Sequence, residues 1–153
     1  MKRTALALLL IALCSVALAD VTVKDAWVRG TTPAQRATGA FMEIVSSEDA
    51  VVLSASSPAA GATELHTMKL EDGIMKMRAM PRLELPAGKP VLFAPGANHV
   101  MLLDLKKQAK PGDVVPITLK IEGKDKKVQS VEVKAQVRDL TATAAPAEHD
   151  HQH

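Results

Sequence analysis

The sequence predicts an all-β protein, an antiparallel β-sandwich of the Greek-key type. Its body is a series of short apolar runs in which every second residue is polar, the pattern of strands that bury one face. Turn-forming Gly, Pro, Asn and Asp residues separate these runs at a spacing typical of sandwiches, and no segment has a convincing amphipathic helical period. We therefore expect about seven to nine short strands.

The first and last strands show the alternation most clearly. Val21, Val23 and Trp27 are expected on one face of the opening strand. Near the other end, residues 115–121 and 131–137 place an apolar side chain at every second position. Pro116 interrupts the first of these runs. Because proline cannot donate a hydrogen bond to a β-ladder, that strand is predicted to lie at an edge or to contain a bulge.

The middle strands are predicted from shorter apolar runs. Turn sequences such as Glu71-Asp72-Gly73 and Pro95-Gly96-Ala97-Asn98 separate them. Residues of this kind favour tight reversals of the chain, which an antiparallel sandwich needs. The predicted strands are residues 40–45, 51–55, 63–66, 74–80, 91–94 and 100–105.

The first 19 residues have the composition of an export signal. Lys2 and Arg3 precede an apolar stretch over residues 5–17, and Ala17-Leu18-Ala19 fits a signal-peptidase site, so we expect cleavage before Asp20. The stretch is too short to span a bilayer, and no later run approaches the roughly 20 apolar residues of a membrane helix. Residues 20–140 are therefore expected to form one exported, soluble domain without stable membrane insertion.

Cys14 is the only cysteine of the chain, and it lies in the predicted signal. Lipid attachment there is disfavoured because Leu13 precedes it, where such motifs have a small side chain. The mature domain would have neither a disulfide nor a thiolate ligand, which excludes a blue-copper electron-transfer site. Loss of Lys2 and Arg3 reduces the 19 basic residues to 17, equal to the 17 acidic ones. A net charge near zero gives no reason to expect nucleic acid or an anionic membrane as partner.

Histidine and methionine are the residues that point to a function. Outside the last residues of the chain, the only histidines are His66 and His99; Met77 follows the first after ten residues, and Met101 follows the second after one. Imidazole nitrogen together with thioether sulfur is a soft ligand set that suits Cu(I). Residues two apart on a strand share a face, and a hairpin around Gly73 would bring Met77 close to His66. We predict that these two histidines and two methionines bind the metal.

The other methionines have simpler explanations. Met42 lies in an ordinary strand and is predicted to pack in the core. Met80, just before a proline, is expected to make a contact at a sheet edge. Met68 and Met75 lie near predicted ligands, where hydrophobic packing or covering of the site is favoured over a role as spare thioethers.

The chain ends in residues 141–153, which are small and polar and then rich in histidine. Such a composition cannot bury enough apolar surface to become ordered, so we expect a flexible tail. His149, His151 and His153, with Asp150 between them, resemble a ligand cluster for Cu(II) or Zn(II). The tail is therefore a candidate second metal site, and an inert tail is the alternative.

The spacing of the four predicted ligands, His-x10-Met-x21-His-x-Met, resembles the signature of the periplasmic PCu(A)C family of copper chaperones. The resemblance extends over roughly residues 21–137. It implies a cupredoxin-like β-sandwich that carries Cu(I) in the periplasm. Separately, we expect the protein to be a monomer. The resemblance also implies delivery of the ion to cytochrome c oxidase subunit II or to another copper-accepting periplasmic protein. The supporting segments are Asp25-Ala26-Trp27-Val28-Arg29, Glu64-Leu65-His66, residues 72–78 and residues 85–88.

Two other functions compete with that of a carrier. A copper storage or resistance protein could use the same ligands without a dedicated oxidase acceptor. A copper enzyme is less favoured, because an N-terminal histidine brace cannot form at the predicted mature terminus Asp20. Neither a Ser-His-Asp arrangement nor a pair of catalytic carboxylates stands out. We therefore predict a non-enzymatic copper carrier.

Overall fold

The structure is a computed structural model that describes residues 19–143. The predicted signal up to residue 18, and residues 144–153 with the three tail histidines, lie outside the described residues. Across residues 19–143 the chain has no helix, and hence none that is long and apolar enough to cross a membrane. The strands are β1 (Val21–Arg29), β2 (Ala37–Ser46), β3 (Ala50–Ser56), β4 (Ala60–Glu71), β5 (Ile74–Met80), β6 (Leu83–Leu85), β7 (Val91–Phe93), β8 (His99–Leu105), β9 (Val114–Gly123) and β10 (Val128–Arg138).

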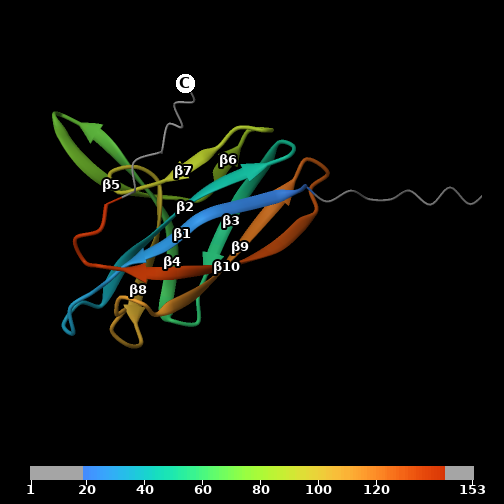
Figure 1. The fold of residues 1–153 in the computed structure, drawn as a ribbon. Coiled ribbons are helices and arrows are strands. Elements are labelled where there is room, and N and C mark those ends of the chain that lie inside the picture. The colour runs from blue at the N-terminus through green and yellow to red at the C-terminus, as the bar shows by residue number, and fades with distance from the viewer. Residues whose placement is uncertain (1–18, 144–153) are drawn as a thin grey trace, which may run out of the picture.

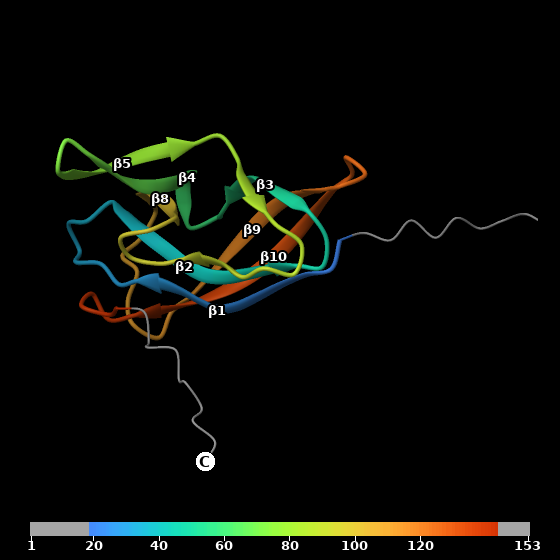
Figure 2. The same ribbon diagram turned by 90° about the horizontal axis from the view of Figure 1, so that it is seen from above.

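The strands are hydrogen-bonded in the order β5-β4-β8-β2-β1-β10-β9-β3-β6, and β7 pairs with β2. Neighbouring strands are antiparallel, as predicted, except that β1 and β10 run parallel. The path from β5 to β1 forms one layer of the sandwich, and β10, β9, β3 and β6 form the other. In both views the hairpin of β4 and β5 reaches away from the body at one end of the molecule (Figures 1 and 2).

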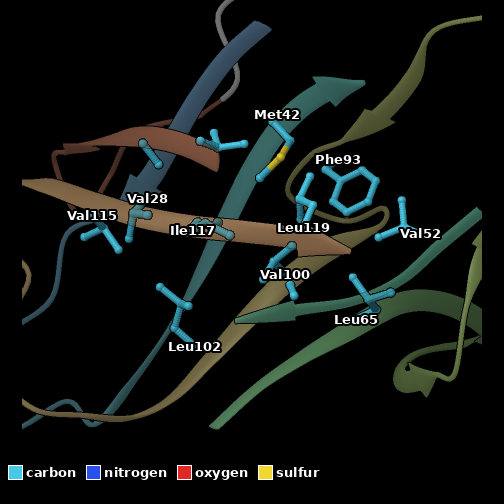
Figure 3. Packing of buried hydrophobic residues seen from close by; sticks show 14 of the residues in the cluster. Val28, Met42, Val52, Leu65, Phe93, Val100, Leu102, Val115, Ile117 and Leu119 are labelled. Carbon is cyan, nitrogen blue, oxygen red and sulfur yellow. The ribbon is translucent and has the colours of Figure 1, made fainter. Parts of the chain in front are cut away.

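The hydrophobic core lies between the two layers. Ile117 and Leu119 of β9 are fully buried and meet Met42 of β2 and Val100 of β8, as Figure 3 shows. Burying a side chain of this size contributes about 1.5–3 kcal/mol. The prediction that Met42 packs in the core is thereby confirmed, since only 2% of its surface is exposed.

A β-bulge changes the face on which Trp27 lies. Val23 pairs with Ile44 of β2, but Trp27 pairs with Phe41, so four steps along β1 correspond to three along β2. The extra residue reverses the alternation within β1. Val21 and Val23 pack against the core, whereas Trp27 lies on the opposite face of the sheet. The prediction that all three share a face is wrong for this reason.

The strand with Pro116 is not an edge strand as a whole. β9 lies between β10 and β3. Pro116 pairs with Lys134 of β10, but pairing with β3 begins only at Thr118, opposite Ser56. The proline therefore lies beyond the part of β9 that needs donors toward β3, which is why an interior strand tolerates it.

Candidate metal centre

Three adjacent strands carry the four predicted ligands. His66 of β4 lies opposite His99 of β8, and Met101 follows two residues along β8. On the other side of β4, Met77 of β5 lies opposite Met68, two residues from His66. Because residues two apart in a strand share a face, all four predicted ligands project from the same face of β5, β4 and β8.

This face is the one opposite the hydrophobic core. The residues that alternate with the histidines, Leu65 and Val100, pair with each other and are both buried in the core. The predicted ligands therefore occupy the outer face of the layer, near the β4–β5 hairpin. A metal site in this position can bind or release an ion without repacking of the hydrophobic core.

The β4–β5 turn sets the register of this hairpin. Asp72 and Gly73 connect Glu71 to Ile74, and both have positive φ angles, 53° and 77°. Two such residues form the type I′ turn that matches the twist of antiparallel strands. The predicted turn is confirmed, and Met77 lies diagonally across from His66 rather than directly opposite it.

The two histidines lie side by side. Their ring centroids are 5.7 Å apart and the rings are inclined by 64°. His99 is buried, and its Nδ1 lies 3.0 Å from the carbonyl oxygen of Ala97. Because a carbonyl only accepts hydrogen bonds, Nδ1 carries the proton and Nε2 keeps its lone pair. The structure thus holds His99 with a nitrogen available for a metal ion.

His66 is oriented by a carboxylate. Its Nε2 lies 2.7 Å from Oε2 of Glu64, which lies two residues earlier on the same face. Its Nδ1 is buried and has no hydrogen-bond partner among the described residues. A buried nitrogen without a partner is unusual in a folded protein. If Nε2 donates to the carboxylate, Nδ1 is the unprotonated nitrogen and a suitable metal ligand.

The surroundings of His99 keep its ring neutral. Burial lowers the pKa of His99, and the positive charges of a protonated His66 and of Arg29 act in the same direction. The hydrogen bond to Ala97 opposes them and raises the pKa, but burial is the largest effect. Since a metal binds the neutral imidazole, His99 is prepared for ligation near neutral pH.

A cavity of about 260 Å³ lies on this face. Met77, His99 and Met101 line it together with Arg29 and Phe41, whereas His66 does not line it. The side chain of Met77 is 45% exposed, but that of His99 is buried. The predicted ligands therefore extend from a protected end at His99 to an open end at the hairpin.

Sequence patterns predicted no role for the aromatic and basic side chains that border this cavity. Trp27 packs on Phe41 at a centroid distance of 4.5 Å, and the guanidinium group of Arg29 lies 5.4 Å from the Phe41 ring. Phe41 in turn lies 6.2 Å from the ring of His99. A Cβ at Gly39 would come within 2.8 Å of the Phe41 ring, so glycine makes room for this stack. Trp27 and Arg29 lie two residues apart, so the sequence indicates that they share a face of β1. It does not indicate which face, because the bulge before Trp27 cannot be recognised from the local pattern.

Besides the two histidines, the soft ligands on this face are methionines. Within the part of the chain that the structure describes, no three His, Cys, Asp or Glu side chains are grouped so that they could hold a metal ion. Two imidazoles and nearby thioethers remain, which is a donor set for a soft cation such as Cu(I). The predicted ligands thus fit copper better than Zn(II) or a hard divalent ion.

Known proteins are similar to this chain in sequence and in fold. A family model described as LpqE-like matches residues 21–137. A protein of Leifsonia xyli subsp. xyli (strain CTCB07), named "Putative lipoprotein Lxx21020", is 30% identical over 115 residues, 74% of this chain and 69% of its own length.

Solved structures extend the comparison. The solution structure of CuI-DR1885 from Deinococcus radiodurans is 32% identical, covers 81% of both chains and has a TM-score of 0.60. The apo PCuAC domain of PmoF2 has a TM-score of 0.66 at 22% identity, covering 84% of this chain and 98% of that domain. The latter likeness shows the fold alone and confirms the predicted cupredoxin-like β-sandwich. The chain belongs to the LpqE-like family, and the PCu(A)C resemblance read from its sequence is confirmed.

Proposed function

We propose that this protein is a copper chaperone that binds one Cu(I) ion through His66, Met77, His99 and Met101. The observation that carries the proposal is the strand register that aligns these side chains on one face, with the two imidazole rings 5.7 Å apart. Two neutral nitrogens and two neutral sulfurs favour Cu(I) over Cu(II). The similar structure from Deinococcus radiodurans is that of a CuI form, which supports the same oxidation state.

The open end of the site suits a carrier. Met77 is half exposed and lies on an edge strand, so a ligand from another protein can approach the ion before the bonds to the buried His99 break. None of the proposed ligands is a thiolate. A cysteine-containing acceptor could therefore take the ion by ligand exchange, which needs no change of oxidation state.

The biological setting follows from the export signal and the family. We propose that residues 1–19 are removed, that the protein acts as a monomer in the periplasm, and that cytochrome c oxidase subunit II or another copper-accepting protein receives the ion. His149, His151 and His153 are proposed to capture Cu(II). The lipoprotein name of the Leifsonia relative raises lipid attachment as a competing fate for the N-terminus, which mass spectrometry of the exported protein would distinguish.

Anaerobic titration against a competing Cu(I) chelator tests the site. The intact domain should bind one Cu(I), and His99→Ala and Met77→Ala should each weaken binding by about tenfold or more, since even indirect supporting groups contribute about 10–100-fold in metal sites. Met80→Leu is the matched control, because Met80 lies on the same strand but packs against the core. Unchanged affinity in both ligand variants would refute the assignment.

A transfer experiment separates a carrier from a storage protein. The copper-loaded domain is mixed with an equal concentration of the copper-free soluble fragment of subunit II, with its cysteines reduced. Movement of Cu(I) to the fragment is expected for a chaperone. Retention of the ion by the domain would instead support storage or resistance.

A further inference from the structure

A second group of thioethers lies on the β4–β5 hairpin, next to the proposed copper site. Met68 is paired directly with Met77, and Met75 lies two residues before Met77 on the same strand. All three therefore share the face that carries His66. Directly paired side chains have Cβ atoms about 4.5–5.5 Å apart, and diagonal neighbours about 7–8 Å. Methionine has three rotatable bonds, so three sulfurs at these spacings can meet at one ion.

Packing does not account for Met75 and Met77. The side chain of Met75 is 50% exposed and that of Met77 is 45% exposed, and neither belongs to the hydrophobic core. Met68 is partly buried and lines the same cavity as Met77. Met75 was predicted to pack against other side chains or to cover the site, but half of its surface is exposed. A flexible, polarizable side chain at this exposed position is available for a ligand.

The exposed fraction of the side chains on this face increases from His99 toward the turn of the β4–β5 hairpin. His99 is 5% exposed, Met77 is 45% exposed and Met75, nearest the turn, is 50% exposed. The hairpin that carries the last two reaches away from the body (Figures 1 and 2). An ion that leaves the two histidines toward the hairpin would thus remain in contact with sulfur until it reached the surface.

We propose that Met68, Met75 and Met77 form a second, weaker Cu(I) site, through which the ion enters and leaves the site at His66 and His99. This inference rests on the proposed function. Three thioethers provide soft, neutral donors for Cu(I). Transfer is a ligand exchange in which the bond to Met77 persists, the bonds to both imidazoles and Met101 break, and bonds to the other two sulfurs form. The ion stays monovalent and no proton or electron is needed.

The site is tested in the double variant His66→Ala/His99→Ala, which lacks both imidazoles. Anaerobic Cu(I) titration is followed by the NMR signals of [¹³C-methyl]methionine. We expect residual binding of one Cu(I), weaker than in the intact protein, with shifts at the methyl groups of Met68, Met75 and Met77. Adding Met68→Leu or Met75→Leu should weaken this residual binding by about tenfold, whereas adding Met80→Leu should not.

If the double variant does not fold, the proposal can still be tested by measuring the rate of Cu(I) transfer from the single variant Met75→Leu, which keeps both histidines. Met75→Leu should leave the equilibrium affinity within about twofold of the original, and it should slow transfer of Cu(I) to a chelator by about fivefold or more. Unaltered transfer rates would overturn the proposal, as would residual binding in the double variant that is independent of Met68 and Met75. If the unmodified domain binds no Cu(I), the proposed function itself fails. If the unmodified domain binds Cu(I) tightly but either of these two overturning results is found, only the second site is refuted.

Discussion

At the scale of single residues, the two histidines are held in different ways for the same purpose. His99 is buried and bonded through Nδ1 to a backbone carbonyl, and His66 is bonded through Nε2 to the carboxylate of Glu64. In each case one ring nitrogen has a partner that fixes the ring, and Nδ1 of His66 is buried without a hydrogen-bond partner among the described residues. A sequence shows that two histidines are present, but it does not show which nitrogen each of them offers.

The lowered pKa of His99 predicts how stability depends on pH. Burial keeps the folded protein from protonating this ring at a pH where the unfolded chain, with a histidine pKa of about 6.5, already binds a proton. The contribution of His99 to the unfolding free energy should therefore be constant above about pH 6.5. It should decrease as the pH falls from about 6.5 through the pKa of this ring in the folded protein. Urea unfolding of the copper-free protein at several pH values would measure this, with an NMR titration of His99.

The matched variant for this titration is His99→Gln, which lacks the titrating ring. Its unfolding free energy should depend less steeply on pH between about 6.5 and the folded pKa. An equal slope in both proteins would show that another group causes the loss.

Glu64 is predicted to support copper binding without contacting the ion. A carboxylate bonded to a ligating imidazole orients the ring and raises its basicity, which contributes about 10–100-fold in metal affinity. Glu64→Gln should therefore weaken Cu(I) binding by about tenfold in a chelator competition. Glu84→Gln is the control, because Glu84 is an exposed residue on β6 whose carboxylate forms an ion pair with Arg82, away from the two histidines. Equal affinities in the two variants would argue that the carboxylate has no such role.

At the scale of elements, most of the strands follow from alternation and turn chemistry. The predicted runs correspond to every strand except β6, whose three residues are too few for a recognisable pattern. The bulge in β1 and the parallel pairing of β1 with β10 depend on contacts between distant segments, which local patterns do not contain. The same limit applies to the site: the spacing predicted four ligands, but it showed neither the hydrogen bond between Glu64 and His66 nor that Arg29 borders the cavity.

The β4–β5 turn is the element on which the position of Met77 depends. Gly73 has a φ angle of 77°, and a β-branched residue there would be strained. Gly73→Val should lower the unfolding free energy by about 1–2 kcal/mol and weaken Cu(I) binding, because the hairpin no longer holds Met77 near His66. Asp72→Asn should preserve both, since Asn tolerates positive φ. Chemical denaturation and chelator competition measure the two effects, and full copper affinity in Gly73→Val would contradict this role of the turn.

At the scale of the whole molecule, the sandwich separates its core from its site. The core fills the space between the two layers, while the predicted ligands lie on the outer face of one layer. An ion bound by these residues could therefore exchange while the packed interior stays unchanged. The predicted ligands come from β4, β5 and β8, so a bound ion would connect the edge of the sheet to its interior.

Copper should therefore stabilise the entire fold and protect the hairpin most. Binding to the folded state alone raises the unfolding free energy by about 4 kcal/mol when free ligand exceeds the dissociation constant a thousandfold. Anaerobic calorimetry should show this increase, and hydrogen exchange should slow most in β5. At the same free copper concentration the increase should be smaller in His66→Ala, by about 1.4 kcal/mol for each tenfold loss of affinity. An equal increase in that variant would place the ion elsewhere.

X-ray absorption spectroscopy would identify the atoms that bind the ion in the Cu(I)-loaded domain, truncated after residue 143 to remove the tail histidines. We predict a first shell of two nitrogen and two sulfur atoms around a monovalent ion. His99→Ala should remove one nitrogen and Met77→Leu one sulfur. A first shell of nitrogen and oxygen alone, or one that neither variant alters, would contradict the proposal that these four side chains carry the copper.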